Sequence, residues 1–299
     1  MTTLRAFLTS LRPRQWTKNL LLFAGIVFTQ RWDDPRLVVN AVGAFLVFCA
    51  LSGVVYIIND IVDRDSDREH PKKRHRPIAS GEISPSLAGW GAAVLLVLAL
   101  GAAWLITFPF FVSAAIYVLL ITAYSLHLKH LALLDVLVLA LGFVVRALAG
   151  IEALRVPEYP PVVITPYFVM TTLFLALFLA VAKRRNELVL LGDGAAGHRR
   201  VLDQYSTSFL DQMLTIATAG VIFSYAAWAT LGDFAIVDET YTMAFTMPFV
   251  LYGVFRYLWL VYHRDEGGAP EVVLLTDRPM QVTILLWTAT TVALLAISR

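Results

Sequence analysis

The chain has 299 residues, of which 58% are hydrophobic and 15% are charged, with a net charge of +2 and a mean hydropathy of +0.70. Soluble domains carry about 25% charged residues, so this composition excludes an ordinary soluble protein. Apolar runs recur along the whole sequence, each near the roughly 20 residues that cross a bilayer as a helix. We therefore expect an all-α, multi-pass membrane protein that forms one domain over residues 1–299.

Nine apolar segments are candidate transmembrane helices. They lie at residues 17–33, 38–58, 86–107, 109–127, 132–151, 162–182, 210–231, 241–262 and 279–297. The first segment is the weakest, because it contains Lys18 and Asn19. An odd number of spans places the two termini on opposite sides of the membrane.

Basic residues are distributed unevenly between the two sides. Of the 24 Lys and Arg, nineteen precede the first span or follow even-numbered spans, four lie on the other side, and Arg146 lies inside the fifth span. The excess of bases marks the cytosolic side. We therefore expect a cytosolic N-terminus. The single cysteine, Cys49, excludes a disulfide within the chain.

The most informative polar segment follows the second span. It begins with the pattern N-D-x-x-D-x-x-x-D, formed by Asn59, Asp60, Asp63 and Asp67. Residues three and four apart share a helix face, so we expect Asn59, Asp63 and Asp67 to form one stripe, with Asp60 at its flank. Crowded carboxylates repel one another unless a cation lies between them. Hard oxygen ligands suit Mg²⁺, which also binds substrate phosphates. The pattern predicts a Mg²⁺ site for a phosphorylated substrate at the membrane surface.

Bases follow this pattern directly, at Lys72, Lys73, Arg74 and Arg76. Basic side chains bind phosphate through charge-assisted hydrogen bonds. The alternative is a solvated loop whose bases only set the topology. Helical spacing that begins at the end of an apolar run favours a binding site.

The acidic motif after the second of nine spans resembles the UbiA superfamily of intramembrane prenyltransferases. The resemblance covers essentially the whole chain. It implies an all-helical bundle with a central cavity, where Asp-rich segments hold a Mg²⁺-bound diphosphate at the cytosolic mouth. It also implies that Tyr124 and Lys129, after the fourth span, contact the diphosphate. Their spacing here is five residues instead of four, and side chains that reach to the membrane surface are the alternative.

The segment after the sixth span departs from the second Asp-rich motif of this superfamily. It reads LAVAKRRNELVLL and carries Lys183, Arg184, Arg185 and Glu187. One carboxylate stands where several are usual, and three bases are added. We therefore expect fewer metal ions and more direct phosphate binding at this segment.

Several segments are similar to the decaprenyl-phosphate phosphoribosyltransferase branch of the superfamily. They are RPRQWTKN at 12–19, REHPKKRHRPIASG at 68–81, VVRALAG at 144–150 and AKRRNEL at 182–188. The similarity implies transfer of 5-phosphoribose from phosphoribosyl pyrophosphate (PRPP) to a polyprenyl phosphate at the bacterial inner membrane. It also implies a product that serves as a precursor of cell-wall arabinan.

This branch gives each candidate residue an expected role. The expected metal ligands are Asn59, Asp60, Asp63 and Asp67, and the expected catalytic residues are Asp63, Asp67, Lys183 and Glu187. The expected substrate-binding residues are Arg14, Lys18, Asn59, Arg76, Tyr124, Lys129, Arg146, Lys183 and Arg184. For Arg14 and Lys18 the alternative is contact with lipid headgroups. For Arg146 it is a side chain that reaches toward the outer surface.

Two other functions remain open from the sequence. One is transfer of a prenyl group to an aromatic acceptor, as in quinone synthesis, which the altered segment at 182–188 disfavours. The other is transport of a phosphorylated solute. Transporters usually bind their solutes near the bilayer midplane on broken helices, whereas the charged residues here gather at one surface.

Overall fold

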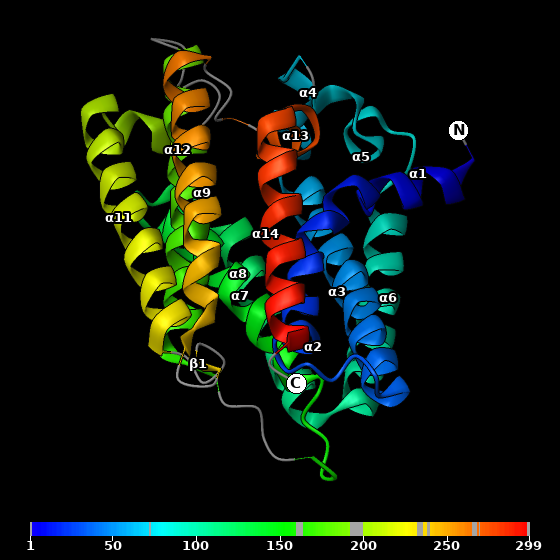
Figure 1. Cartoon of the computed structure of the whole chain (residues 1–299). Helices are drawn as coiled ribbons and strands as arrows, with labels where there is room; N and C mark the ends of the chain where they lie inside the picture. The colour runs from blue at the N-terminus through cyan, green and yellow to red at the C-terminus, as the bar shows by residue number, and fades with distance from the viewer. Residues whose placement is uncertain are drawn as a thin grey trace. The chain divides into compact units, whose positions relative to one another are not determined.

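The structure is a computed structural model that describes residues 2–71, 73–159, 164–191, 200–231, 236–237, 240–264, 268 and 270–297. Within these residues the fold is helical (Figure 1), apart from a short antiparallel pair of strands, β1 (Ile236–Val237) and β2 (Thr240–Tyr241). The first half of the chain forms α1 (Thr3–Ser10), η1 (Pro13–Phe23), α2 (Ala24–Phe28), α3 (Pro35–Val62), α4 (Arg64–Glu69), η2 (Lys73–His75), α5 (Pro77–Ser80), α6 (Pro85–Ile106), α7 (Phe108–Leu126), η3 (Leu128–His130) and α8 (Leu134–Glu152). The second half forms α9 (Pro166–Leu191), η5 (Arg200–Gln204), α11 (Thr207–Leu231), η6 (Thr242–Thr246), α12 (Met247–His263), α13 (Pro270–Thr276) and α14 (Arg278–Ile297).

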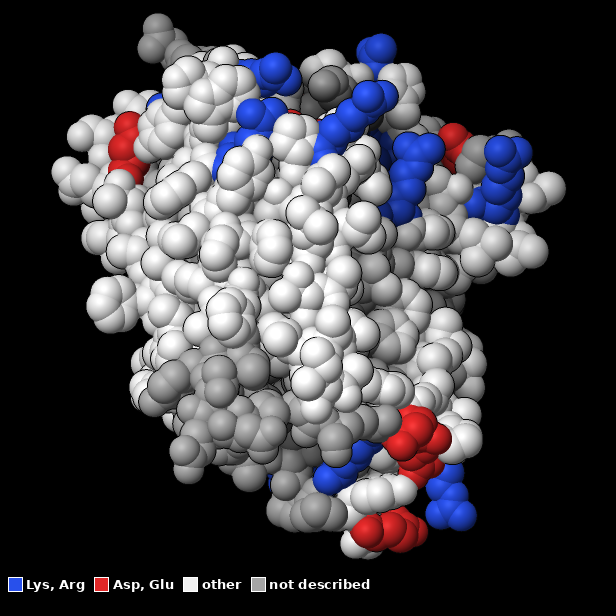
Figure 2. Space-filling view, in the orientation of Figure 1, with Lys and Arg blue, Asp and Glu red and all other residues white. Residues whose placement is uncertain are grey.

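Among the described helices, eight are long and apolar enough to cross a membrane. They are α3, α6, α7, α8, α9, α11, α14 and the segment Met243–His263, which contains α12. The prediction of an all-α membrane protein is confirmed, and these helices correspond to the second through ninth predicted spans. On the face drawn in Figure 2, a wide band without charged residues separates the charged residues near its ends.

The first predicted span, 17–33, does not form one long helix. Residues 13–28 form instead a 3₁₀ helix, η1, followed by the short α2. Runs of 3₁₀ helix this long are uncommon, so the segment needs support from its neighbours. Asn19 within η1 is buried and donates a hydrogen bond to Cys49 Sγ at 3.4 Å. The polar residues that weakened the prediction are therefore part of the packing.

The chain divides into two compact units. Unit 1 comprises residues 1–131 and 142–162, and unit 2 comprises residues 132–141 and 163–299. Helix α8 contributes residues to both units.

Unit 1 is built around α3, which packs against η1, α6 and α7. Phe48 of α3 lies at the centre, with its ring 5.8 Å from that of Phe110 and 5.0 Å from that of Tyr117. All three side chains are fully buried or nearly so. The 28-residue α3 starts at Pro35, after Asp34, whose carboxylate caps the helix by accepting from Arg36 N at 2.8 Å. The cap fixes where α3 begins, and the other end of the helix lies at the predicted acidic site.

A pair of glycines lets η1 and α2 approach α8 within unit 1. A Cβ atom on Gly150 would lie 2.1 Å from the backbone oxygen of Leu22, and one on Gly25 would lie 2.8 Å from the oxygen of Gly150. Neither position has room for a side chain. The N-terminal segment is therefore held against α8 by close backbone packing.

Unit 2 is organised around α9 and α11, which pack along their length. The approach is close because Gly220 of α11 faces the ring of Phe174, 2.4 Å from where a Cβ would lie. On α9, Phe178 also packs against Tyr257 of α12, with ring centroids 5.3 Å apart. This core fixes the C-terminal segment of α9, which carries the second predicted cluster of charges.

Candidate functional site

The acidic motif lies at the end of the helix that contains the second predicted span, where the helix is interrupted. Helix α3 ends at Val62 and α4 begins at Arg64. Between them, Asp63 has φ −87° and ψ 6°, in the sparsely populated region where many active-site residues lie. The backbone N–H of Asp63 still donates to Asn59 O at 2.9 Å. The chain changes direction here while Asn59 and Asp63 stay on one side.

One ammonium group binds both of these residues. Lys129, in η3, donates from Nζ to Asp63 Oδ1 at 2.6 Å and to Asn59 Oδ1 at 3.3 Å. The structure therefore brings Lys129 together with two of the predicted metal ligands, although they are 66 and 70 residues away in the sequence.

A guanidinium group joins the other two acidic residues of the motif. Arg76 Nη1 donates to Asp60 Oδ1 at 3.0 Å and to Asp67 Oδ2 at 2.6 Å. Asp60 and Asp67 are only 2% and 1% exposed. Lys73 Nζ also lies 3.9 Å from Asp67 Oδ1. Burial of two carboxylates requires this compensation, because an unpaired buried charge is costly.

The predicted stripe of Asn59, Asp63 and Asp67 does not form as one row. Asp67 shares its cation with Asp60, while Asp63 shares its cation with Asn59. The reason is the interruption at Asp63, after which α4 no longer continues the face of α3. The exposed Asp65 is not part of these pairs, and its carboxylate lies 3.9 Å from the guanidinium of Arg68.

The geometry of these oxygens fits a divalent cation. The four side chains converge in two pairs, each on one positively charged nitrogen. Mg²⁺ usually takes one or two carboxylates and completes its shell with phosphate oxygens and water, so each pair supplies a suitable partial shell. Within the part of the chain that the structure describes, no three Asp, Glu, His or Cys side chains come together as ligands. A metal at either pair would therefore rely on substrate oxygens as well.

Arg12 belongs to this cluster, and the sequence did not identify it as a site residue. Its Nη2 lies 2.5 Å from Asp60 Oδ1, and its guanidinium lies over the ring of Tyr56 at 4.8 Å. Burial lowers the pKa of Arg12, and the charge of Asp60 opposes this shift. Its backbone is left-handed, with φ 52°, a conformation that costs energy for a residue other than glycine. The fold holds this strained residue at the acidic site.

Other predicted residues of unit 1 have less defined surroundings. Arg14 is exposed, and Lys18 and Tyr124 are half-buried. Their substrate-binding roles stay predictions. Lys72 lies outside the described residues.

Arg146 ends a buried chain of polar side chains within unit 1. It is 7% exposed, donates to Tyr117 Oη at 2.7 Å, and lies over the rings of Tyr117 and Phe143. Tyr117 continues to Ser52 at 3.2 Å, and Ser52 to Asn19 Oδ1 at 3.4 Å. Buried arginine within a membrane segment is costly, and this chain offsets part of the cost. Its predicted role in substrate binding stays a prediction.

The second charged cluster, in unit 2, is built on α9. Arg184 is 1% exposed and donates from Nε to Asp135 Oδ2 at 2.6 Å and from Nη1 to Glu187 Oε2 at 2.8 Å. Asp135 also accepts from Tyr205 Oη at 2.6 Å. The Nε and Nη1 groups of the guanidinium thus each donate to a carboxylate. These contacts favour a positioning role for Arg184, and direct substrate binding by this residue stays an untested prediction.

The neighbours of Arg184 differ from it in their surroundings. Lys183 is half-buried, and among the described residues no ion pair holds its ammonium group. Arg185 pairs with Asp211 at 2.6 Å and lies over the ring of Tyr262 at 4.2 Å. Of the three consecutive bases, Lys183 is therefore the candidate for binding a substrate phosphate.

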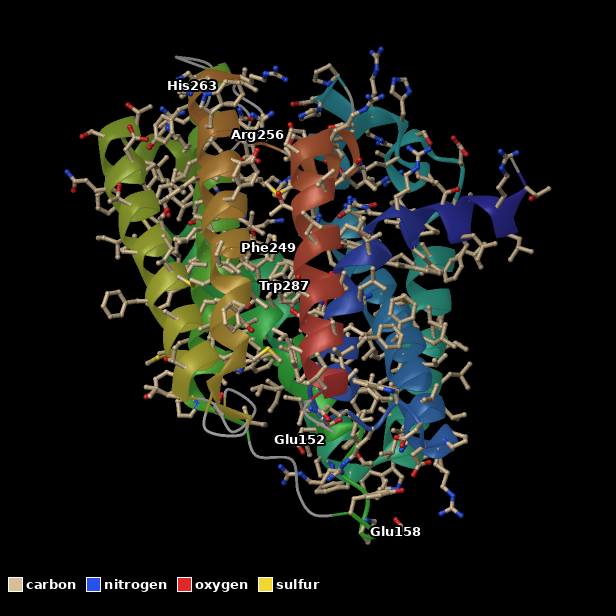
Figure 3. All side chains as sticks on the ribbon, in the orientation of Figure 1. Glu152, Glu158, Phe249, Arg256, His263 and Trp287 are labelled. Atoms are coloured by element: carbon tan, nitrogen blue, oxygen red, sulfur yellow. The ribbon has the colours of Figure 1, made fainter. Side chains whose placement is uncertain are left out.

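Asp277 precedes α14 and has a structural role. It pairs with Arg256, at 3.2 and 2.8 Å, and accepts from Met280 N at 2.9 Å. The hydrogen bond from Arg256 holds the pKa of Asp277 below its usual value. Figure 3 shows Arg256 toward the same end of α12 as His263. These contacts tie the start of α14 to α12.

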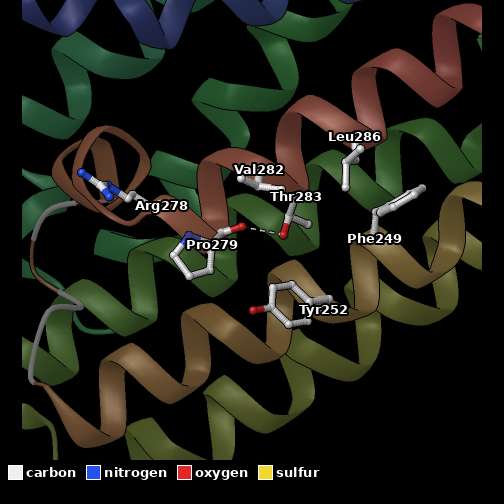
Figure 4. A pocket seen from close by; sticks show the side chains of 7 residues that line it. All are labelled: Phe249, Tyr252, Arg278, Pro279, Val282, Thr283 and Leu286. Atoms are coloured by element: carbon white, nitrogen blue, oxygen red, sulfur yellow. Dashed lines mark hydrogen bonds between the residues drawn. The ribbon is translucent and has the colours of Figure 1, made fainter.

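A mostly apolar pocket of about 500 Å³ lies in unit 2 (Figure 4). Its lining comes from α12 and α14, namely Phe249, Tyr252, Arg278, Pro279, Val282, Thr283 and Leu286. Thr283 turns its hydroxyl to Pro279 O at 2.7 Å. None of the predicted site residues lines this pocket.

Asp135 and Tyr205 are further residues that the sequence reasoning missed. Asp135 is a single acid at the start of an apolar helix. An isolated acid in a hydrophobic segment could have indicated a buried ion pair. Tyr205 has no comparable signal, since a tyrosine near a membrane surface is common.

Comparison with known proteins identifies the family. The sequence pattern of the UbiA prenyltransferase family matches residues 20–276 of this chain. The chain belongs to the UbiA prenyltransferase family. A decaprenyl-phosphate phosphoribosyltransferase from Mycolicibacterium smegmatis is 33% identical over 294 residues, which cover 94% of this chain and 89% of the relative. The enzyme of the same description from Mycobacterium tuberculosis is 33% identical over 293 residues, covering 96% and 93%.

A solved family structure shows the same fold. A UbiA homolog from Archaeoglobus fulgidus, bound to DMAPP and Mg²⁺, superposes with a TM-score of 0.72 at 20% identity, covering 97% of this chain and 99% of that one. The likeness extends over nearly the whole chain and shows the UbiA fold. The family match and the relatives at 33% identity show a membrane transferase of the UbiA family.

Proposed function

We propose that this protein transfers 5-phosphoribose from PRPP to a polyprenyl phosphate of the decaprenyl type and releases diphosphate. The observation that carries the proposal is the segment at 183–187, where bases and one carboxylate replace a second acid cluster. PRPP has a diphosphate on C1 and a phosphate on C5, and the acceptor adds a further phosphate. Three anionic groups require more bases than a prenyl diphosphate does. The relatives at 33% identity support the same choice.

The acidic motif of unit 1 is the proposed site of the donor diphosphate. Asn59 with Asp63, and Asp60 with Asp67, would hold Mg²⁺, as their paired oxygens fit a cation. Bound Mg²⁺ would neutralise charge on the diphosphate and make it a better leaving group. The Mg²⁺ in the solved homolog supports this assignment. Lys129, Arg76 and Arg12 already lie beside these oxygens, so their charges are available to phosphate oxygens when a donor binds.

The reaction needs little acid–base chemistry. The bond from C1 of ribose to the diphosphate oxygen breaks, and its electron pair leaves with the diphosphate. An oxygen of the lipid phosphate forms the new bond to C1 from the opposite face, with inversion. The attacking phosphate is already ionised, so positioning and charge stabilisation supply most of the rate enhancement.

Lys183 and Glu187 are the proposed catalytic residues of α9. Lys183 would bind phosphate of the donor, because it is only half-buried and no ion pair holds its ammonium group among the described side chains. Glu187, with 26% of its side chain exposed, would accept hydrogen bonds from the ribose hydroxyls and stabilise positive charge that develops on the sugar.

The proposed membrane arrangement has nine spans with a cytosolic N-terminus and a central cavity that opens to the cytosol. In this arrangement the segment formed by η1 and α2 would be the first span and would bring the total of eight long helices to nine. At about 2.0 Å per residue in 3₁₀ helix and 1.5 Å in α-helix, η1 and α2 together extend for about 30 Å, close to the hydrocarbon thickness. This arrangement would let an acceptor stay in the bacterial inner membrane while its phosphate meets a cytosolic donor. The product would serve as a lipid-linked pentose precursor for cell-wall arabinan.

A choice between donors tests the proposal. Purified protein in liposomes is offered labelled PRPP with polyprenyl phosphate, and in parallel a labelled prenyl diphosphate with an aromatic acid. We expect lipid-linked label only from PRPP. Turnover of the prenyl diphosphate with no use of PRPP would contradict the proposal and favour a role in quinone synthesis. PRPP that crosses the membrane unchanged would favour a transporter.

A further inference from the structure

A chain of hydrogen bonds in unit 2 runs from a backbone amide to the carboxylate of Glu187. Leu133 N donates to Tyr205 Oη at 2.7 Å, and Tyr205 Oη donates to Asp135 Oδ1 at 2.6 Å. The other oxygen of Asp135 accepts from Arg184 Nε at 2.6 Å, and Arg184 Nη1 donates to Glu187 Oε2 at 2.8 Å. The chain joins the start of α8, the segment before α11, and α9.

From Asp135 through Arg184 to Glu187, the exposed fraction of the residues increases. Asp135 is 0% exposed, Arg184 is 1% exposed and Tyr205 is 7% exposed, whereas the Glu187 side chain is 26% exposed. The inner members are therefore closed to any ligand, and Glu187 is the member that a substrate can reach. An accessible functional group is held in position by buried neighbours that hydrogen-bond to it, and this chain has that arrangement.

The end of the chain opposite Glu187 is the backbone amide of Leu133, which lies in a strained turn. Leu133 has a positive φ of 68°, a conformation that is a clear outlier for a branched residue. Its N–H is bound by the Tyr205 hydroxyl, so Tyr205 helps to keep the turn that starts α8. Asp135 follows two residues later. Tyr205 therefore contacts both the backbone of this turn and the carboxylate that follows it.

The protonation and charge of these side chains also favour the observed hydrogen-bond directions. Burial, followed by the hydrogen bond to Asp135, raises the pKa of Tyr205, so its hydroxyl stays a donor at neutral pH. The fixed fork of an arginine side chain binds carboxylates in defined directions. Arg184 therefore couples the position of Asp135 to that of Glu187 through one planar group.

We propose that Tyr205, Asp135 and Arg184 are positioning residues that fix the Glu187 carboxylate against the sugar of the substrate. The proposal rests on the proposed function, which gives Glu187 its contact with ribose hydroxyls. It assigns Arg184 to the support of Glu187 and leaves phosphate binding on this helix to Lys183.

The conservative variant Tyr205→Phe tests the proposal, because it removes only the hydroxyl. A group that acts through Glu187 on the reacting sugar affects turnover more than binding. We expect Tyr205→Phe to lower kcat about 10- to 100-fold, with a KM for PRPP within about twofold of the wild type. The control is Tyr262→Phe, which removes a hydroxyl from another arginine-bound carboxylate, Asp211. This control should leave kcat unchanged.

A double-mutant cycle separates a positioning role from a general loss of stability. In the Glu187→Gln background, Tyr205→Phe should reduce kcat no further, because its effect passes through Glu187. Equal fold-losses in both backgrounds would overturn the proposal. The same cycle measured by Tm needs no activity: Tyr205 and Glu187 should be coupled, and Tyr262 and Glu187 should be additive. If the wild-type protein does not use PRPP, the proposed function is wrong. The Tm cycle still tests this inference in that case, and additive Tm changes for Tyr205 and Glu187 would overturn it.

Discussion

Four side chains of the acidic motif share two cations in this structure, and this sharing explains how so much charge is held at a membrane surface. Lys129 lies between Asn59 and Asp63, and Arg76 lies between Asp60 and Asp67. Each base offsets the repulsion that the acids would otherwise exert. When an anionic donor arrives, the same bases are in place to bind it.

Asp63 is the residue whose loss should separate catalysis from folding. It lies at a helix end with 26% of its side chain exposed, so Asp63→Asn should leave Tm within about 2 °C of the wild type, as surface changes usually do. Turnover should nearly vanish, because a metal-bound carboxylate is lost.

The matched measurement uses a chelator on the wild type. Removal of divalent cations should abolish turnover, and added Mg²⁺ should restore it. Full activity of Asp63→Asn, or of the wild type in chelator, would exclude a metal held at this motif.

Lys183 should determine affinity for the donor. Hydrogen bonds between charged groups contribute about 1.5–3 kcal/mol, so Lys183→Ala should raise the KM for PRPP roughly 10- to 100-fold. Arg155→Ala is the control, because Arg155 pairs with Glu152 three residues earlier and away from either cluster. Its KM should not change. An unaltered KM in Lys183→Ala would assign the phosphate to another base.

At the scale of elements, the N-terminal segment shows how close packing replaces a regular helix. Residues 13–28 form η1 and α2, and their backbone contacts α8 where Gly25 and Gly150 have no side chains. A continuous α-helix with side chains at these positions could not approach so closely. The irregular segment carries Asn19 into the core, where it hydrogen-bonds to Cys49.

Gly150→Ala should therefore destabilise unit 1. The added Cβ would lie 2.1 Å from Leu22 O, and overpacking of this kind costs typically about 1–3 kcal/mol. Gly101→Ala is the control, because nothing lies within 4 Å of its Cβ position and it lies inside α6. Alanine there should hold or raise Tm, since it favours helix over glycine by about 0.5–1 kcal/mol. Thermal unfolding in detergent would measure both, and equal Tm values for the two variants would contradict the packing described.

The sequence predicted the long helices well, because apolar runs of span length have few alternatives in a membrane protein. It did not predict the 3₁₀ helix at the first predicted span, because hydropathy does not distinguish a 3₁₀ helix from an α-helix. It also predicted the acidic motif but not its pairing, because helical periodicity assumes that α3 continues through Asp63. Asp135, Arg12 and Tyr205 escaped notice because their partners lie 48 residues or more away. Long-range ion pairs leave little pattern in one sequence.

At the scale of the whole molecule, orientation in the membrane decides which compartment supplies the donor. In unit 1, α4 and the loop that carries Glu158 lie at opposite ends of the helices (Figures 1 and 3). From the excess of bases we expect α4 in the cytosol, and Glu158 should then lie outside.

Cysteine labelling tests this orientation. With Cys49 changed to alanine, Ser66→Cys should react with an impermeant thiol reagent only in inside-out vesicles. Glu158→Cys should react only in right-side-out vesicles. Both positions are exposed. Labelling of both from the same side would contradict the span count between them and the proposed cytosolic site.

The fate of the two ends of the donor tests the proposed reaction most directly. PRPP labelled with ¹⁴C in the ribose and with ³²P in the terminal phosphate of its diphosphate is incubated with the protein, Mg²⁺ and polyprenyl phosphate. Because the bond at C1 breaks, the account predicts that ¹⁴C enters the lipid phase and ³²P stays in the water phase, one for one. Recovery of both labels in the lipid, or of neither while the lipid is otherwise consumed, would contradict phosphoribosyl transfer by this protein.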